Sequence, residues 1–484
     1  MPSRPRTAAA ALIALSVLLL MCACSKGSDG ARAERIILLS CDTLRADRLG
    51  VYGYERDTSP RLDAFARDCV VFEEAYSTAP MTQPAVSSML TGRMPIEIGA
   101  APGNTELMPP DVETLAEQLR AHGLATAGVV SNWMLKRDEG DIGVQQGFDH
   151  FDDEMTDREV TRPEMRERLA TGTTDAAIAW LADRPSDEFF LWVHYQDPHG
   201  PYTPPDEFAQ LFNSPRGAGP PLPLSPNVLG KGGLPTYQAL GSERDPTVYR
   251  DLYDAEIRYV DTEVGRLLDW LEEQDLLDGS LIVFTSDHGE ALGEHDFWFC
   301  HGESVYRELV RVPLLIRWPD GQAPEGLGTV GDDGIRRCPR VASLLDIAPT
   351  ALAAVGLADD GARGVSLLDE APPKDRVIPQ DLLNLPGQPT WFAASNERFR
   401  IIWTAAFGGA RLFDITEDPG ETKDLAPMQP AYAKRMHSEH SAFLNDSKRK
   451  RGTTMNIDID AQATLNALGY VGGSDPPDEE PDGR

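Results

Sequence analysis

Short runs of mainly apolar residues, bounded by polar or turn-forming residues, recur along the chain. Strands that are buried on both faces, as in a parallel sheet, show such continuous runs rather than strict alternation. The pattern therefore predicts buried strands of a mostly parallel sheet. The predicted strands are residues 36–41, 125–130, 189–194, 281–285 and 314–317.

Segments with helical spacing lie between the predicted strands. We expect helices at residues 111–122 and 250–274, and a third that begins near Gln83 and stops at Gly92. This alternation predicts an α/β fold with helices on both faces of the sheet. Ligands of such folds bind at the carboxyl ends of the strands. The residues that follow the strands are therefore the candidates for a functional site.

The pattern changes from about Lys374 onward. Residues 399–404 and 411–414 predict short antiparallel strands, and residues 461–468 predict a final helix. We expect a small C-terminal subdomain that contains an antiparallel sheet. Residues 214–247 are rich in proline and glycine and are expected to form a surface loop.

The N-terminus has the features of an export signal. Arg4 and Arg6 precede an apolar segment, residues 8–20, that is too short to cross a bilayer comfortably. The sequence around Cys22 and Cys24 resembles a bacterial lipobox, and Cys24, which follows an alanine, fits it better. We expect an exported protein of the bacterial cell envelope with a lipid anchor on Cys24, or alternatively an ordinary cleaved signal.

These patterns divide the chain into five parts. We expect a lipoprotein signal peptide at 1–24, a polar linker at 25–34, an α/β domain at 35–373, the C-terminal subdomain at 374–473 and a disordered acidic tail at 474–484. The cysteines beyond the signal show no metal-knuckle spacing. An exported location permits disulfides between them, but the sequence alone cannot pair them.

The net charge of the chain argues against some classes of binding partner. Its 484 residues include 77 Asp and Glu but only 45 Lys and Arg, which gives a net charge of -32. So acidic a surface argues against nucleic acid, which requires a basic surface, and against a polybasic membrane patch. An anionic substrate would need a local positive centre, and a metal ion is the obvious source.

Four residues suit such a centre. Asp42 follows the first predicted strand, and Asp287 with His288 follows the strand at 281–285. Thr82 lies at the expected start of a helix, where the helix dipole favours an alkoxide and an anion. A nearby metal ion would lower the pKa of its hydroxyl group and make it a nucleophile. Taken singly, each residue could also be an ordinary helix cap.

Three histidines lie close to these segments in the sequence. His194 and His199 follow the strand at 189–194, and His301 follows the Asp287 segment. Histidines in these positions could hold the anionic oxygens of a substrate, protonate a leaving group or bind a second metal ion. The alternative for each is a purely structural role.

These residues belong to longer segments that resemble the sulfatase family of the alkaline phosphatase-like superfamily. The resemblance runs from about residue 35 to residue 473. It implies that fold, with Asp42, Asp287, His288 and Thr82 at the metal, and Thr82 as the nucleophile. It also implies substrate or leaving-group roles for His199 and His301, and less securely for His194. The matching segments are 42–50, 88–92, 284–295, 311–314, 341–350 and 412–415.

The departures from the family pattern bear on the reaction. Typical members have a cysteine or serine at the position of Thr82, which is converted to formylglycine, and threonine cannot be converted. Val86 replaces an arginine, Thr43 an acidic ligand and His301 a lysine. A threonine ester lacks the second hydroxyl group that expels sulfate. Turnover then needs attack by water on the central atom, which phosphorus tolerates well.

The sequence therefore predicts a metal-dependent hydrolase of sulfuric, phosphoric or phosphonic esters. We expect one divalent ion rather than two, with calcium, manganese and zinc all open, and a small-molecule, glycan or lipid ester as the substrate. One alternative is a non-catalytic, sulfatase-like protein that binds glycans. Another is a phosphoryl-group transferase that acts on a surface lipid or glycan.

Overall fold

A mixed sheet of nine strands forms the centre of the protein. The computed structural model describes residues 32–446 and 453–454 except for 100–105, 138–142, 163–165, 218, 226–229, 359–360, 369–371, 375, 383–389, 405–406 and 408. The strands in spatial order are β15 (Thr329–Val330), β16 (Arg336–Cys338), β2 (Val70–Phe72), β14 (Leu314–Arg317), β10 (Ser280–Ser286), β1 (Arg35–Cys41), β9 (Phe189–Tyr195), β5 (Ala125–Val130) and β6 (His150–Asp152).

All strands of this sheet except β14 and β15 run in one direction. β1 lies between β9 and β10, and its last residue, Cys41, is level with Tyr195 and Ser286. The three strands therefore end together, and the residues that follow them emerge at the same edge of the sheet.

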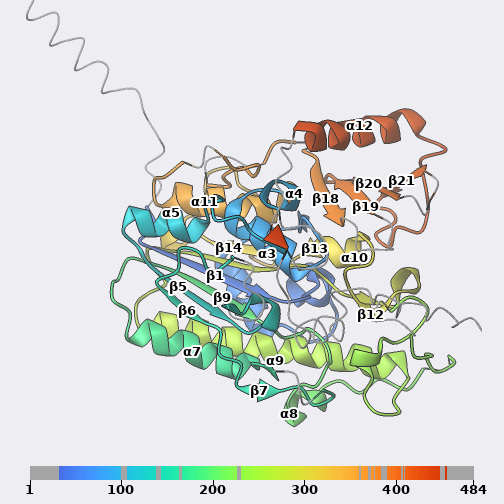
Figure 1. Cartoon of the computed structure of the whole chain (residues 1–484), viewed down its shortest axis with the longest axis horizontal. Coiled ribbons are helices and arrows are strands. Elements are labelled where there is room, and N and C mark those ends of the chain that lie inside the picture. The colour runs from blue at the N-terminus through green and yellow to red at the C-terminus, as the bar shows by residue number, and fades with distance from the viewer. Residues whose placement is uncertain are drawn as a thin grey trace, which may run out of the picture. The chain divides into compact units, whose positions relative to one another are not determined.

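Helices cover both faces of the sheet (Figure 1). One face packs against α7 (Ala170–Ala182) and α9 (Pro246–Glu273). The other packs against α3 (Thr82–Thr91), α5 (Leu115–His122) and α11 (Ile347–Ala354). Successive side chains of a strand point to opposite faces, so alternate residues of β1 enter two different apolar cores.

The C-terminal subdomain consists of an antiparallel sheet and a covering helix (Figure 1). The elements are β18 (Ile378–Leu382), β19 (Trp391–Ser395), β20 (Phe399–Thr404), β21 (Gly409–Asp414) and α12 (Pro430–Asp446). Arg400 of β20 is fully buried, pairs with Glu421 at 2.7 Å and donates to the carbonyl oxygen of Val305 at 2.7 Å. The subdomain is thereby tied to the segment that follows His301.

Smaller elements connect this framework. The helices among them are α2 (Pro60–Phe65), α4 (Pro95–Ile98), α8 (Asp206–Ala209) and α10 (Arg307–Val310). The strands among them are β3 (Ala75–Tyr76), β4 (Glu106–Leu107), β7 (Asp157–Arg158), β8 (Arg166–Glu167), β11 (Ala291–Leu292), β12 (Trp298–Cys300), β13 (Arg311–Val312), β17 (Ala342–Ser343) and β22 (Thr453–Thr454). Short 3-10 turns account for much of the remaining regular structure.

The fold predicted from the sequence is confirmed, with corrections to some element bounds. β14 is a strand as expected but runs antiparallel to β10. α5 begins at Leu115 rather than at residue 111, because the side chain of Thr114 caps it by accepting from the N–H of Glu117. α9 begins at Pro246 rather than at residue 250, because Asp245 caps that end. The predicted helix at 461–468 lies outside the described residues.

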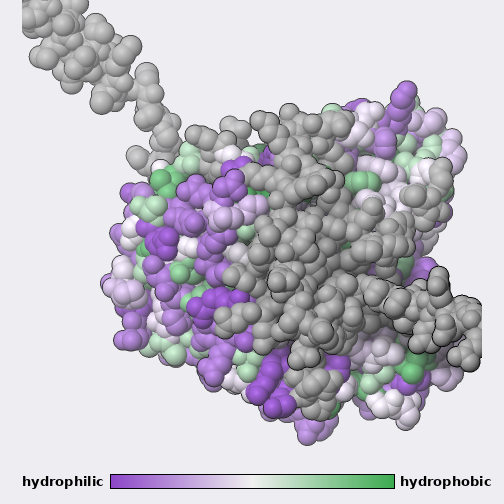
Figure 2. All heavy atoms as spheres, in the orientation of Figure 1, coloured by the Kyte–Doolittle hydropathy of each residue, from purple (hydrophilic) through white to green (hydrophobic). Residues whose placement is uncertain are grey.

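The described part of the chain contains no helix that is long and apolar enough to cross a membrane. Four cysteines within it are buried and unpaired: Cys41, Cys69, Cys300 and Cys338. On the face drawn in Figure 2, hydrophilic residues predominate around α5 and α7, as the acidic composition predicts. Cys24 lies outside the described residues, so the lipid anchor stays a prediction.

Candidate active site

Two carboxylates meet where β1 and β10 end. Asp42 follows β1 and Asp287 follows β10, and both side chains are fully buried. His288 lies beside them, with its Nε2 atom 3.7 Å from Oδ1 of Asp42 and 3.5 Å from Oδ2 of Asp287. Residues separated by more than two hundred positions in the sequence thus face one point at the carboxyl edge of the sheet.

Thr82 completes this group. It is the first residue of α3, and its Oγ1 atom lies 3.4 Å from Nε2 of His288. The side chain of Thr82 is fully buried. At the first turn of a helix, unsatisfied N–H groups and the helix dipole stabilise negative charge. The position therefore suits both an alkoxide on Thr82 and an anionic group next to it.

The donor atoms of this group fit a divalent metal ion. Oδ1 of Asp42 and Oδ2 of Asp287 are buried without a hydrogen-bond partner, which is costly for carboxylate oxygens unless a cation satisfies them. Nδ1 of His288 lies 2.9 Å from the carbonyl oxygen of Gly289 and can donate to it, which leaves the lone pair of Nε2 facing the carboxylates. This is the usual arrangement of a metal-binding histidine.

The electrostatics of the group agree with this fit. Burial, and then the neighbouring His301, lowers the pKa of His288 to about 3, so the ring is neutral and able to bind a metal ion. Burial, and then the charge of Asp42, raises the pKa of Asp287 well above its usual range. Burial opposes ionisation of Asp42 too, but His199 and other histidines nearby hold its pKa below the usual range. Two buried carboxylates this close to each other call for a compensating positive charge.

His199 and His301 lie on one side of His288. Their ring centroids are 5.1 Å apart, and that of His301 is 4.6 Å from His288. Nδ1 of His301 is 3.2 Å from Oε1 of Glu290, a fully buried carboxylate. Burial alone lowers the pKa of His301, but Glu290 more than offsets this and raises it. His301 is thus prepared to carry a positive charge, whereas burial lowers the pKa of His199.

His194 lies on β9, beside Asp42. Its side chain is fully buried, with Nδ1 2.9 Å from Oγ of Ser40 and Nε2 3.9 Å from Oδ2 of Asp42. Ligand atoms of His194, Asp42 and Asp287 all lie within 4.8 Å of one another, so His194 could also hold a metal ion. The predicted contact between His194 and a substrate stays a prediction.

Two residues that the sequence did not single out support the site. Asn132, in the turn after β5, donates from Nδ2 to Oδ2 of Asp42. Glu290 orients His301, as described above. The only signal for Asn132 was its place just after a predicted strand. For Glu290 it was its place three residues after Asp287, in a segment already matched to the family.

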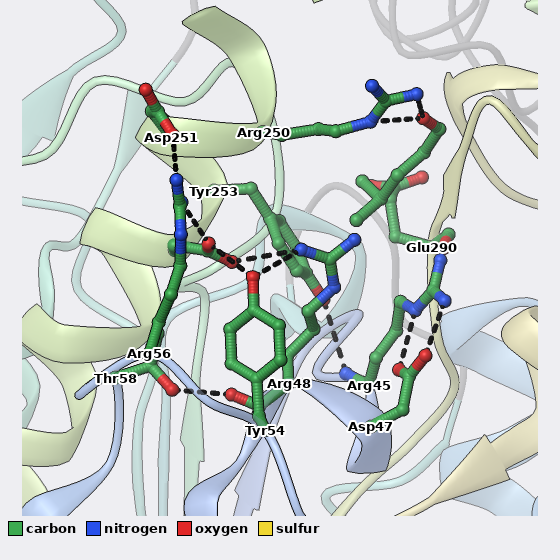
Figure 3. Close-up of polar contacts among 12 residues, drawn as sticks. Arg45, Asp47, Arg48, Tyr54, Arg56, Thr58, Arg250, Asp251, Tyr253 and Glu290 are labelled. Carbon is green, nitrogen blue, oxygen red and sulfur yellow. Dashed lines mark hydrogen bonds and ion pairs between the residues drawn. The ribbon is translucent and has the colours of Figure 1, made fainter. Parts of the chain in front are cut away.

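The turn after β1 is held in an unusual conformation. Thr43 has a φ of 56°, in the left-handed region, and non-glycine residues adopt it only where the surroundings enforce it. Tyr253 of α9 donates to the carbonyl oxygen of Thr43 at 2.7 Å. It also accepts from the backbone N–H of Arg45 at 3.2 Å (Figure 3). The side chain of Arg45 bonds Asp47 and the carbonyl oxygen of Glu290. Asp42 is thus fixed by contacts to α9 and to the Asp287 segment.

Comparison with known proteins shows the family to which the chain belongs. The family profile named Sulfatase matches residues 34–357. The chain belongs to the sulfatase family. It is 24% identical over 493 aligned residues to a Delta 4,5-hexuronate-2-O-sulfatase of Bacteroides thetaiotaomicron, covering 92% of this chain and 96% of that one. It is also 26% identical to the iduronate 2-sulfatase of Mus musculus, over 62% of each chain.

Solved sulfatase-family structures share the fold. One, described as a complex with its substrate D-glucosamine-2-N,6-O-disulfate, has a TM-score of 0.68 and 20% identity, covering 87% of this chain and all of that one. Another is the phosphonate monoester hydrolase of Agrobacterium radiobacter, with a TM-score of 0.66 and 20% identity, covering 86% and 96%. Structural relatives of this sulfatase-family hydrolase therefore include enzymes of sulfur and of phosphorus esters.

Proposed function

We propose that this sulfatase-family hydrolase cleaves sulfuric esters of saccharides with Thr82 as its nucleophile. The observation that carries the proposal is the position of the Thr82 hydroxyl. It lies at the N-terminus of α3 and beside Nε2 of His288, next to two buried carboxylates with unsatisfied oxygens. The sulfated-saccharide class is suggested by the relatives, which are named as hexuronate and iduronate sulfatases.

Asp42, Asp287 and His288 would hold a divalent metal ion, together with the oxygen of Thr82. The ion, when bound, supplies positive charge that lowers the pKa of a hydroxyl group beside it and attracts an anionic ester. His194 is available as a further ligand. The identity of the ion stays open, because two carboxylates, one or two imidazoles and a hydroxyl group suit both zinc and manganese.

The side chains of this protein can then carry out a two-step exchange. The proton of Oγ1 of Thr82 passes to solvent water, and Oγ1 bonds to the central atom of the ester while the bond from that atom to the alcohol oxygen breaks. His301, held by Glu290, is placed to protonate the departing alcohol, and the ring of His199 lies beside it. Water then attacks the same central atom and gives its proton to the now neutral His301, while the bond from that atom to Oγ1 breaks and Thr82 regains its proton from solvent.

Esters of phosphorus are the second candidate class, and Thr82 itself favours them. A threonine ester can be released only by attack on the central atom, and phosphorus accepts such attack more readily than sulfur. The structural similarity to phosphonate monoester hydrolases is consistent with this possibility. A panel of aryl sulfate, aryl phosphate and aryl phosphonate esters separates the two classes by the anion released.

Substitution of Thr82 tests the nucleophile. We expect Thr82→Ala to lower kcat by about 10³-fold or more, because a nucleophile and its base act as one unit, whereas Thr82→Ser keeps the hydroxyl group and a measurable rate. Thr91→Ala, at the other end of α3, is the matched control and should leave kcat near that of the wild type. Equal rates for wild type and Thr82→Ala would remove Thr82 from the reaction. Release of a transfer product when an acceptor alcohol is added would indicate a transferase.

A further inference from the structure

A hollow in the C-terminal subdomain has a charge opposite to that of the whole chain. We call it the basic pocket; four cationic side chains line it, and Glu397 is its one carboxylate among the described residues. Its volume is about 530 Å³. The chain as a whole has 77 acidic and 45 basic side chains, so an excess of cations at one point is unusual. The hollow beside Arg45, by comparison, has three arginines and three carboxylates. The cations of the basic pocket are Arg340, Lys374, Arg398 and Arg435.

Two of these cations rest on aromatic rings. The rings of Phe399 and Tyr432 lie 4.7 Å apart between centroids. The guanidinium carbon of Arg435 is 4.6 Å from the ring centroid of Tyr432, and that of Arg398 is 5.1 Å from Phe399. Guanidinium groups that lie over aromatic rings are oriented before a ligand arrives and keep N–H groups for hydrogen bonding. Less side-chain entropy is therefore lost when an anion binds.

Most of the positive charge in the pocket is available to a ligand. Lys374 is exposed and makes no hydrogen bond or ion pair with the described residues. Arg340 approaches Glu397 only to 3.9 Å, and Arg435 approaches Glu439 only to 3.8 Å. Exposed ion pairs of this length contribute little stability. Arg398 alone is firmly paired, with Asp414 at 2.8 Å.

The basic pocket is separate from the active site. Glu397 and Arg398 form the turn between β19 and β20. The other end of that hairpin holds Trp391, which packs in one apolar cluster with Met81, the neighbour of Thr82. The four residues of β19 beyond Trp391 span roughly 13 Å at the usual rise of a strand. A ligand in the pocket therefore does not occupy the active site.

We propose that the basic pocket is an accessory site that binds sulfate and carboxylate groups of an acidic saccharide chain. This inference uses the proposed function only for the class of ligand. Arginine N–H groups match sulfate and carboxylate oxygens in pairs, and a pocket of this volume accommodates one or two sugar residues. On a strongly acidic protein, such a site would retain a polyanionic chain that the rest of the surface repels. It would thereby raise the local concentration of ester groups for the active site.

Direct binding measurements test the proposal. The probe is a heparin octasaccharide, and its binding to the full chain is measured by calorimetry. A neutral dextran of equal length is the reference ligand. We expect Arg340→Gln combined with Arg435→Gln to weaken octasaccharide binding by at least about tenfold, since two charged contacts are lost. Lys434→Gln, which removes the cation next to Arg435 on α12 but outside the pocket, should leave binding unchanged.

Activity towards a small aryl ester gives the second readout. The pocket variants should keep the wild-type kcat/KM for an ester too small to reach the pocket. If the glutamine variants do not fold, Arg340→Lys combined with Arg435→Lys replaces them. This variant keeps the positive charges but loses the paired N–H groups of arginine, so we expect an octasaccharide affinity below that of the wild type by less than about tenfold.

Octasaccharide affinity within twofold of the wild type in the glutamine double variant would overturn the proposal. So would binding of anionic lipid vesicles, but not of the octasaccharide, through Arg340 and Arg435. Because binding does not require turnover, loss of aryl esterase activity in Thr82→Ala with intact octasaccharide binding would separate the two proposals.

Discussion

A single buried carboxylate, Glu290, controls His301. It lies 3.2 Å from Nδ1 of the imidazole, fixes which nitrogen carries the proton and stabilises the charged ring. The backbone oxygen of the same residue also accepts a hydrogen bond from the guanidinium group of Arg45, so it links the segment after β10 to the turn after β1.

Replacing Glu290 should reveal whether His301 protonates the leaving group. We expect Glu290→Gln to lower kcat by about 10- to 100-fold for alkyl leaving groups, because general acid catalysis is lost, and by much less for nitrophenol, which leaves without a proton. The comparison is made by measuring kcat and KM across leaving groups of different pKa.

The chain offers a matched control two residues beyond His301. Burial raises the pKa of Glu303 to about 9, so this side chain is already neutral, and Glu303→Gln should change kcat little. An equal loss of kcat for all leaving groups in Glu290→Gln would indicate a structural role for Glu290 instead.

The four residues proposed to hold the metal ion could be named from the sequence, because they follow a strand or begin a helix. Asp42, Asp287, His288 and Thr82 all carry that signal. Asn132 and Glu290 could not be assigned roles in the same way, because their roles arise from contacts across the sheet edge. Asn132 reaches Asp42 past β9, and no spacing along the chain records that neighbour.

At the level of elements, α9 contacts two of the segments that carry site residues. Tyr253 holds the turn after β1, and one helical turn further on Glu256 meets Asp197 in the loop that carries His199. The carboxyl groups of Glu256 and Asp197 interact electrostatically, and both are buried. Burial, and then the charge of Asp197, raises the pKa of Glu256 well above its usual range, so this group is neutral in the folded protein.

The pair predicts a pH-dependent stability. Glu256 has a raised pKa in the folded state, so the unfolded chain loses its proton first and stability falls as the pH rises above about 4.3. Glu256→Gln keeps a neutral hydrogen-bond donor and removes this loss. Its free energy of unfolding relative to the wild type should therefore increase from pH 5 to pH 8, by at most about 1.4 kcal/mol per pH unit, and its relative melting temperature should rise with it.

Thermal melts of both proteins across that range provide the measurement. Other acidic groups near the pair, Glu167 and Asp157, are unchanged by the substitution and affect both proteins alike. A constant difference in melting temperature at every pH would show that Glu256 is ionised in the folded state.

Element types could be predicted better than element ends. The strands at 125–130 and 314–317 have the predicted bounds, because polar or turn-forming residues lie close to both ends of each run. The direction of β14 could not be inferred, since a buried antiparallel strand inside a covered sheet has the same apolar run as a parallel one. The starts of α5 and α9 were missed because the capping residues lie outside the amphipathic pattern.

For the whole molecule, the active site and the stability of the fold should be coupled. Asp42 and Asp287 are buried side by side, and each disfavours ionisation of the other. A ligand that binds only the folded protein stabilises it by about 2.7 kcal/mol at one hundred times its dissociation constant. A divalent ion should therefore raise the melting temperature of chelator-treated protein by a few degrees.

Two variants test whether the metal-induced rise in melting temperature comes from the active site. Asp42→Asn should abolish the response to metal, because it removes a ligand and the charge that attracts the ion. Asp381→Asn, a buried carboxylate of β18 that pairs with His440, is the matched control and should keep the full response. A metal-induced shift of equal size in Asp42→Asn would place the ion elsewhere in the protein.

The level ending of β9, β1 and β10 also sets which changes of length this protein tolerates. A strand turns successive side chains to opposite faces, so losing or gaining one residue near the start of β1 would exchange the following side chains between the two apolar cores or shift Asp42 by one position relative to Asp287. A change of length in a connecting loop leaves this register intact. The length of this one strand therefore matters as much to the site as the chemistry at its end.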